Sequence, residues 1–256
     1  APTPQPPPPP PPAPNPPPVV STPSPSLLFS APELSDFWLR QSGPGAITEA
    51  ADPAGSAQKV FKLTVSDADS YPVTPTENPR AEMLSPPEIE AGDEIWWSAK
   101  FFLPSPDFPA SVPNFVTLLQ GPYGQPWNGT PPFHIEANGG VLKWQRNSTY
   151  NWDIPWQMPL VRDQWVNILI HERFASDGWF EMWVNGQPVT FFGGSTHNPN
   201  GVGPTQRLAM QTMDRSNNAE PNSIYLMSYR KKGMFDSLTV YHGPLQIGTT
   251  RVSVSG

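Results

Sequence analysis

The chain has 256 residues, no cysteine and a formal net charge of −7. The negative charge excludes nucleic acid as a general partner, because nucleic-acid binding requires a basic surface. Without cysteine no disulfide can form, and no stretch approaches the roughly 20 apolar residues of a membrane-spanning helix. We therefore expect no membrane partner.

The first 26 residues differ in composition from the rest of the chain. Of the 38 prolines, 15 lie within the first 25 residues, where large apolar side chains are almost absent. Such a segment cannot bury enough surface to offset the entropy lost on ordering. We predict a disordered proline-rich linker over residues 1–26 and one domain over residues 27–256. Proline-rich tethers are common in exported proteins, so we expect an extracellular protein, and we expect it to be monomeric.

Short runs typical of β-strands follow along the domain, separated by Gly, Pro, Asn and Asp. The predicted strands are 59–66, 94–103, 115–119, 133–137, 141–145, 165–173, 179–184, 187–192, 207–213, 225–229 and 236–242. The only helical candidate is a single turn within 32–39. This pattern predicts an all-β fold built as a two-sheet antiparallel sandwich.

Two neighbouring predicted strands alternate clearly. In 165–173 the apolar positions face one way, and the other face carries Asn167, Leu169, His171 and Arg173. In 179–184 the corresponding face carries Glu181 and Trp183, and Asn185-Gly186 predicts a tight hairpin turn. An apolar face opposite a polar and aromatic one predicts a sheet that lines an open sugar-binding groove. Of the ten tryptophans, we expect at least two to line it and the others to pack in the core or at its rim.

Four stretches resemble motifs of the heparin-lyase-like and glucuronan-lyase-like polysaccharide lyases. They are Asn78-Pro-Arg-Ala-Glu82, the stretch from Gly92 to Pro104, the stretch from Trp165 to Gly186, and the strand from Ser223 to Arg230. Tyr225 and Met227 stand where that last strand has Lys and Gly in those families. Leu119-Gln120-Gly121 stands where alginate lyases have Gln-Ile-His. The resemblance implies a concanavalin-A-like β-jelly roll that cleaves a uronic-acid polysaccharide by β-elimination.

Such an elimination requires a group that neutralises the uronate carboxylate, a base that takes the C5 proton and an acid that protonates O4. Tyr229 matches the final tyrosine of the family strand, and neighbouring Arg230, Lys231 and Lys232 favour its phenolate. The resemblance thus implies Tyr229 as base and acid; the alternative is a tyrosine packed on a sheet. Further candidates are Arg80 as a bidentate partner of the carboxylate, Gln120 as a donor at a strand end, and His134 as base or neutraliser.

For Arg80 the alternative is an ion pair with Glu82, for Gln120 a strand-end cap, and for both His134 and His171 a structural role. The candidate substrate-binding residues are Lys143, Gln145, His171, Arg173, Trp183, Tyr225, Arg230 and Lys231. The expected partner is an anionic polysaccharide. An unsulfated, glucuronan-like polymer is preferred, because the chain is not basic.

Two other functions remain open. A lectin-like binding module would explain a groove with tryptophans without catalysis. A jelly-roll glycoside hydrolase would need two carboxylates about 5–5.5 Å apart, and the nearest candidates are Glu88 with Glu90 and Asp93 with Glu94. We expect no required cofactor and no metal at the catalytic residues; Asp67 and Asp69 could contribute to a structural calcium site.

Overall fold

The computed structural model describes residues 26–41, 45–67, 78–86, 89–123, 131–147, 152–192, 203–213 and 222–254. The predicted linker lies outside the described residues except for Ser26, so the division into linker and domain remains a prediction. Within the described residues no helix is long and apolar enough to cross a membrane.

The described residues form strands joined by turns, with two short 3₁₀ helices. The strands are β1 (Leu27–Ala31), β2 (Trp38–Gln41), β3 (Ile47–Ala51), β4 (Lys59–Ser66), β5 (Arg80–Leu84), β6 (Glu94–Phe102), β7 (Val112–Tyr123), β8 (Phe133–Gly139), β9 (Val141–Asn147), β10 (Trp152–Pro159), β11 (Trp165–Arg173), β12 (Trp179–Val184), β13 (Gln187–Pro188), β14 (Leu208–Ala209), β15 (Ser223–Arg230), β16 (Ser237–His242) and β17 (Leu245–Gly248). The 3₁₀ helices are η1 (Leu34–Asp36) and η2 (Arg251–Val254).

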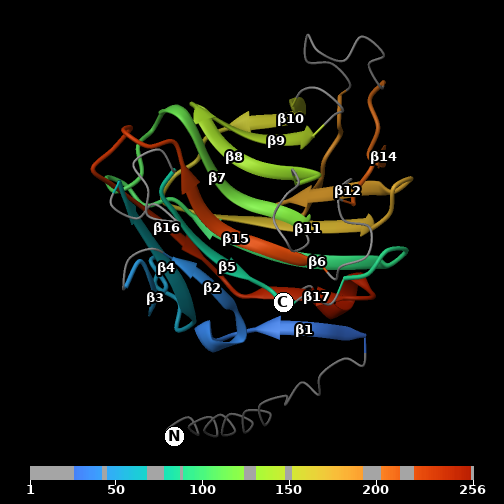
Figure 1. The fold of residues 1–256 in the computed structure, drawn as a ribbon, viewed down its shortest axis with the longest axis horizontal. Coiled ribbons are helices and arrows are strands. Elements are labelled where there is room, and N and C mark those ends of the chain that lie inside the picture. The colour runs from blue at the N-terminus through green and yellow to red at the C-terminus, as the bar shows by residue number, and fades with distance from the viewer. Residues whose placement is uncertain are drawn as a thin grey trace, which may run out of the picture.

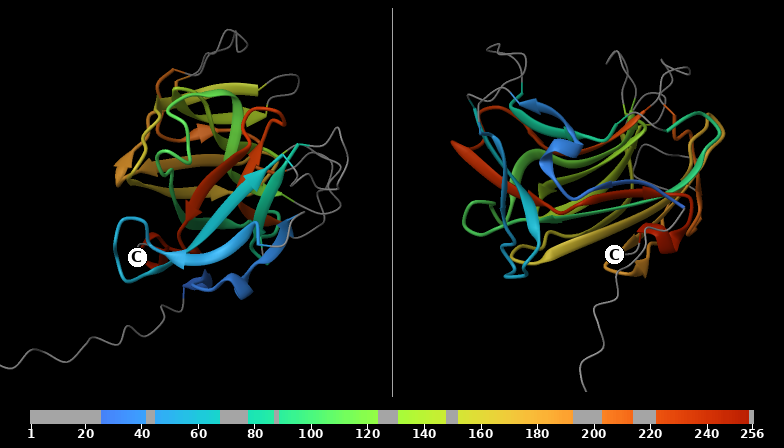
Figure 2. Two further views of the ribbon diagram at one scale, coloured as in Figure 1. Left: turned by 90° about the vertical axis from the view of Figure 1, so that its left-hand side faces the viewer. Right: turned by 90° about the horizontal axis from the view of Figure 1, so that it is seen from below.

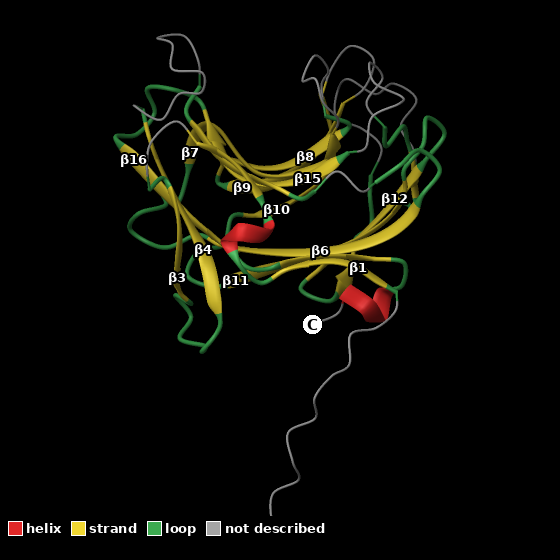
Figure 3. Ribbon diagram, turned by 60° about the horizontal axis from the view of Figure 1, so that its bottom comes forward, coloured by secondary structure: helices red, strands yellow, loops and turns green. Residues whose placement is uncertain are grey.

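The strands form two antiparallel sheets, which confirms the predicted all-β sandwich (Figure 1). The large sheet has ten strands, with the order β13-β12-β11-β6-β16-β4-β3, and β1, β14 and β17 attached beside this path. The small sheet has seven strands in the order β10-β9-β8-β7-β15-β5-β2. Both sheets are strongly curved, and the small sheet lies inside the bend of the large one (Figures 2 and 3).

The hydrophobic core lies between the two sheets. Phe133 and Trp144 of the small sheet pack on Phe180 of the large sheet, with ring centroids 4.5 and 4.9 Å apart. Trp97 of β6, which also belongs to the large sheet, stacks on Phe133 with the ring centroids 6.4 Å apart. Each sheet therefore turns one apolar face toward the core, and its other face points away from the core.

The predicted strands 59–66, 165–173 and 179–184 are observed with the same bounds. At the turn after 179–184, both Asn185 and Gly186 have positive φ, 49° and 79°, which confirms the predicted hairpin. The strands predicted over 187–192 and 207–213 shrink to two residues each, and β1, β2, β3, β5, β10 and β17 were not among the predicted runs. The single turn expected within 32–39 is η1.

Strand β7 is longer than the predicted run 115–119 and contains an irregularity that matters for the site. Its register with β8 shifts between Thr117 and Leu119, so Thr117 lies opposite Glu136 and Gln120 lies opposite His134. A bulge changes the side to which the following residues point. Thr117 and Gln120, three positions apart, therefore share the face that is directed away from the core.

Candidate active site

The outward face of the small sheet is hollowed into a groove of about 390 Å³. Its walls come from β7, β8, β9, β15 and the residue Pro131 before β8. The lining side chains are Phe115, Thr117, Gln120, Pro131, His134, Glu136, Asn138, Gln145 and Tyr229. Three of the four residues predicted to be catalytic are therefore in one groove.

Strand register explains why these residues meet. Tyr229 lies opposite Arg80 on one side and Thr117 on the other. Gln120 lies opposite His134, and His134 lies opposite Gln145. Neighbouring strands are only about 4.8 Å apart, so a row of side chains crosses the groove from one strand to the next.

Tyr229 lies half-buried at one side of the groove among three neighbours. The guanidinium carbon of Arg80 is 4.5 Å from the centre of its ring, and the ring of Phe115 is 5.3 Å away. The Asn78 side-chain amide donates a hydrogen bond to the Tyr229 hydroxyl oxygen at 3.2 Å. These contacts fix both the ring and the oxygen that would move protons.

Arg80 joins this tyrosine to a buried carboxylate. Its Nη1 is 3.7 Å from Oε1 of Glu82, so the ion pair considered from the sequence is present. The same guanidinium contacts Tyr229, as described above. The ion pair and the cation–π contact occur together, and they place a positive charge directly beside the tyrosine.

A second group is centred on Glu136, a buried residue at the other side of the groove. His134 Nε2 is 3.2 Å from Glu136 Oε2. Asn138 donates to Glu136 Oε1 at 3.1 Å, and Gln145 donates to the same oxygen. The carboxylate thereby fixes the positions of His134 and Gln145.

Sequence reasoning assigned no role to Glu136, Thr117, Asn138 or Asn78. The alternation over 133–138 did contain a signal, since His134, Glu136 and Asn138 follow at intervals of two and must share a face. Lys143 lies on the neighbouring strand opposite Glu136, on the same face as Gln145. Its position is compatible with the predicted subsite.

Tyr225, Arg230 and Lys231 lie apart from the groove lining. Tyr225 is buried with Leu84 and Met227 in a small apolar cluster against which Tyr229 packs. Arg230 is fully buried, where it donates to the Phe235 carbonyl at 2.8 Å and pairs with Asp67 at 3.0 Å. Arg230 is therefore not accessible to a polymer. The cation beside Tyr229 is Arg80 from the neighbouring strand.

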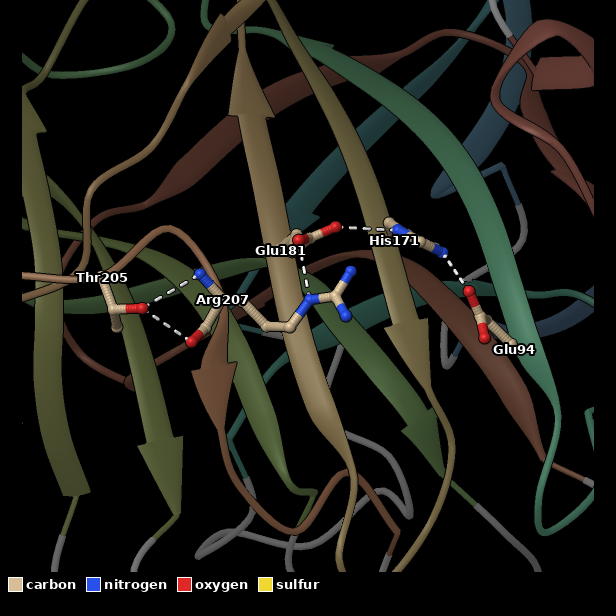
Figure 4. Close-up of polar contacts among 5 residues, drawn as sticks. All are labelled: Glu94, His171, Glu181, Thr205 and Arg207. Atoms are coloured by element: carbon tan, nitrogen blue, oxygen red, sulfur yellow. Dashed lines mark hydrogen bonds and ion pairs between the residues drawn. The ribbon is translucent and has the colours of Figure 1, made fainter.

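His171, Arg173 and Trp183 lie on the outer face of the large sheet. His171 Nδ1 is 2.8 Å from Glu181, and its Nε2 is 2.9 Å from Glu94 (Figure 4). Burial alone would raise the pKa of Glu181, but hydrogen bonds from Arg207 and His171 outweigh it and lower that pKa. The groove that holds Tyr229, Gln120 and His134 thus lies on the other sheet from the face predicted on 165–184, because alternation identifies a shared face but not which sheet carries these residues.

Metal ligands do not cluster in the part of the chain that the structure describes: no group of three or more His, Cys, Asp or Glu side chains could hold an ion. Asp67 accepts a hydrogen bond from the Gly233 backbone at 3.0 Å and pairs with Arg230. Asp69 and Glu88 lie outside the described residues. The structural calcium site remains a prediction.

Solved structures of low sequence identity share this fold. Endo-β-1,4-glucuronan lyase from Trichoderma reesei is similar with a TM-score of 0.66 and 16% identity, over 90% of this chain and 98% of that one. The PL-14 alginate lyase from Aplysia kurodai has a TM-score of 0.54 and 11% identity, over 88% and 100%. A GH131 β-glucanase catalytic domain from Podospora anserina has a TM-score of 0.54 and 13% identity, over 87% and 92%.

Sequence comparison gives a more specific result. No curated protein sequence matches the chain. The model of the family described as "Polysaccharide lyase" matches residues 31–237, which is most of the chain and includes every strand that lines the groove. The chain therefore belongs to the polysaccharide lyase family, and it is an enzyme of that class.

Proposed function

We propose that this polysaccharide lyase cleaves an unsulfated uronate polymer, preferably a glucuronan, by β-elimination in the groove of the small sheet. One observation carries the proposal: Tyr229, Gln120 and His134 line one groove, and Arg80 contacts the tyrosine. The structural similarity to a glucuronan lyase supports the choice of polymer. The net charge of −7 disfavours a heavily sulfated one.

Tyr229 serves as base and then as acid in this proposal. Its deprotonated oxygen takes the C5 proton, and the electrons of the C5–H bond form the C4–C5 double bond. The C4–O4 bond breaks, and O4 receives the proton from the Tyr229 hydroxyl. In a β-1,4-linked glucuronate, H5 and O4 lie on the same face of the ring, so one tyrosine reaches both.

The uronate carboxylate needs neutralising while negative charge develops next to it. Arg80, Gln120 and His134 supply hydrogen-bond donors from three strands of the small sheet: β7 and β8, which are neighbours, and β5, which lies beyond β15. Donors that are fixed before the reaction stabilise such charge without reorganisation. Arg80 is fixed by Glu82 and by the ring of Tyr229, and His134 by Glu136.

The substrate implies further features of the protein. Lys143 and Gln145 on β9 bind the neighbouring sugar units of an anionic chain, because an ammonium and an amide both donate to carboxylate oxygens. Since such polymers occur in cell walls and secretions, we propose that the enzyme acts outside the cell, as a monomer.

A glycoside hydrolase is the second candidate, because the GH131 β-glucanase domain shares the fold. A hydrolase uses a pair of carboxylates across the scissile bond. Among the described residues that line the groove, Glu136 is the only carboxylate, and it is engaged by three side chains. The groove thus favours elimination over hydrolysis.

The proposal is tested by incubating the protein with glucuronan, alginate, heparin and a neutral β-glucan. Elimination is followed by the ultraviolet absorbance of the new C4–C5 double bond, and hydrolysis by reducing ends without that absorbance. We expect the absorbance to rise with glucuronan. If the absorbance rises with none of the uronate polymers and reducing ends appear from the glucan, the enzyme is a hydrolase instead.

Tyr229→Phe then tests the residue assigned to proton transfer. The phenylalanine keeps the ring contacts with Arg80 and Phe115 but has no oxygen, so kcat should fall about 10²–10⁴-fold. Tyr241→Phe is the matched control, since Tyr241 lies on β16 against Phe102 in the large sheet. Activity retained by Tyr229→Phe would refute the assigned role.

A further inference from the structure

A second depression lies on the outer face of the large sheet, on the opposite side of the sandwich from the groove. It has a volume of about 260 Å³. One row of lining residues crosses four strands: Trp183 lies opposite Leu169, Leu169 opposite Ser98, and Ser98 opposite Gln246. The register of the sheet therefore places these four side chains in one row across the depression.

The polar groups of this depression are mostly donors. Lys100 donates to the side-chain oxygen of Gln58 at 3.1 Å, and Ser98 donates to that of Gln246 at 3.4 Å. Each of these amide oxygens already accepts one hydrogen bond, and the NH₂ groups of Gln58 and Gln246 and the ammonium can still donate to a ligand. No carboxylate is among the described residues that line the depression.

Two indole rings hold cations at this place. Lys100 Nζ lies 4.6 Å from the ring centre of Trp165, and the Arg251 guanidinium lies 4.8 Å from that of Trp183. Trp183 itself is half-buried and stacks on Trp96 at 5.3 Å. Cation–π contacts fix Lys100 and Arg251 next to the depression, so two cations lie beside it.

Three carboxylates lie around the depression without lining it. Asp52 interacts electrostatically with Lys100, and it accepts hydrogen bonds from Ser56, the Ala54 backbone and the Trp165 indole. Glu94 pairs with His171, and Glu181 pairs with both His171 and Arg207. Glu181 lies on the row of Trp96 and Glu94 two residues further along β6, and both acids point into the network with His171 and Arg207 (Figure 4). The depression thus combines an indole wall, amide donors and a cation.

We propose that this depression is a second saccharide-binding site, which holds a uronate unit of an acidic polysaccharide without cleaving it. An ammonium and amide NH₂ groups fit carboxylate and hydroxyl oxygens, and an indole fits the C–H face of a sugar ring. Neither a tyrosine nor a histidine lines the depression among the described residues, so it lacks the side chains assigned to proton transfer and carboxylate neutralisation in the groove. The inference rests on the proposed function only in the choice of polymer.

Calorimetric titration with short glucuronan oligosaccharides tests the site, in a Tyr229→Phe background that prevents cleavage. We expect two binding events per chain. Trp183→Ala should weaken the event at the outer face about tenfold or more. Lys100→Met keeps the aliphatic stem but removes the charge, and should weaken it about threefold to tenfold, most at low salt. Phe192→Ala removes a ring that is 61% exposed and lines neither site, and should leave both events unchanged.

A single binding event that neither substitution alters would overturn the second site. Equal binding of a neutral cello-oligosaccharide, unaffected by Lys100→Met, would overturn the assignment to uronate. Thermal unfolding checks that each variant is folded. If Trp183→Ala does not fold, the test of the second site rests on Lys100→Met. Wild-type protein that binds at this site but gives no ultraviolet absorbance would refute cleavage and leave the second site standing.

Discussion

Glu136 organises one half of the groove through its two oxygens. One oxygen faces His134 Nε2, and the other accepts hydrogen bonds from Asn138 and Gln145. The residue is buried, so these partners replace water as its hydrogen-bonding environment. It lies beside groups that would contact the substrate, and we regard it as a positioning residue.

Glu136→Gln should impair turnover more than binding. An amide has one oxygen in place of two, so it cannot accept from Asn138 and Gln145 while also facing His134 with an acceptor. Slight misplacement of a donor in the groove reduces kcat, here by about 10-fold to 100-fold. We expect KM for glucuronan to change far less than kcat, as measured by steady-state kinetics.

Asn138→Ala provides the control for this substitution. It removes one donor to the same carboxylate but leaves the contacts of Glu136 with His134 and Gln145. Its kcat should stay close to that of the wild type. If both variants lose activity equally, or if KM rises in step with the fall in kcat, Glu136 has no specific positioning role.

The sequence identified part of this site because motif resemblance indicated Tyr229 and strand alternation indicated His134. It could not identify the contact between Arg80 and Tyr229, because that contact depends on which strands are neighbours. For the same reason it placed Arg230 beside the tyrosine, whereas adjacent residues of a strand point to opposite faces. Alternation placed Glu136 on the same face as His134, but nothing in the sequence indicated which side chains it contacts.

At the level of elements, the irregularity in β7 determines the composition of the groove. Regular alternation from Val116 would direct Gln120 toward the core together with Leu118. The register shift between Thr117 and Leu119 instead buries both Leu118 and Leu119 and turns Gln120 into the groove. The next residue is Gly121, which packs so closely against the Phe133 ring that no side chain fits there.

Gly121→Ala should destabilise the fold. A Cβ at this position would overlap the ring of Phe133. That ring is buried between Trp97, Trp144 and Phe180 and cannot move aside cheaply. We expect a loss of about 1–3 kcal/mol in the free energy of unfolding, measured by urea denaturation.

Gly140→Ala is the matched control, because a Cβ there would meet no atom within 4 Å. Its free energy of unfolding should remain within about 0.5 kcal/mol of the wild type. A Gly121→Ala protein as stable as this control would show that the β7–β8 contact is looser than the structure indicates.

Elements with a clear period were the predictable ones. Strand β12 alternates between buried and half-buried residues over its full length, β11 alternates from Trp165 to Ile170, and the bounds of both were predicted correctly. Strands at the borders of the sheets were missed, as in β3, where exposed polar residues interrupt the pattern. Such strands are held by pairing with a neighbour, which a local pattern does not reveal.

At the scale of the whole molecule, two groups in the interior carry opposite pKa shifts. Burial raises the pKa of Glu172 to about 8, although the Trp97 indole donates a hydrogen bond to it at 2.7 Å. Burial lowers the pKa of His242 to about 4, and its Nε2 lies 3.0 Å from the Met227 carbonyl oxygen of the opposite sheet. Both residues are therefore neutral in the folded protein near pH 6.

These shifts make the free energy of unfolding depend on pH with a predictable sign. The folded chain holds a proton on Glu172 that the unfolded chain has lost above about pH 4.5, so stability falls as the pH rises from 4.5 to about 8. The unfolded chain binds a proton on His242 below about pH 6.5, so stability falls as the pH drops from 6.5 to about 4. Between 4.5 and 6.5 the two slopes cancel.

Glu172→Gln should remove the loss of stability above pH 6.5 and replace the plateau below it with a rise. In the wild type we expect the two groups to give a plateau between about pH 4.5 and 6.5, and a loss of at most about 1.4 kcal/mol per pH unit from 6.5 to 8. Urea denaturation across pH 4–9 measures the slopes, which do not depend on any constant cost of the substitution. In Glu172→Gln the contribution of His242 is unopposed, so stability should rise up to pH 6.5 and stay level beyond it. If the variant loses stability between pH 6.5 and 8 as steeply as the wild type, the alkaline limb belongs to another group and Glu172 is not the buried acid responsible.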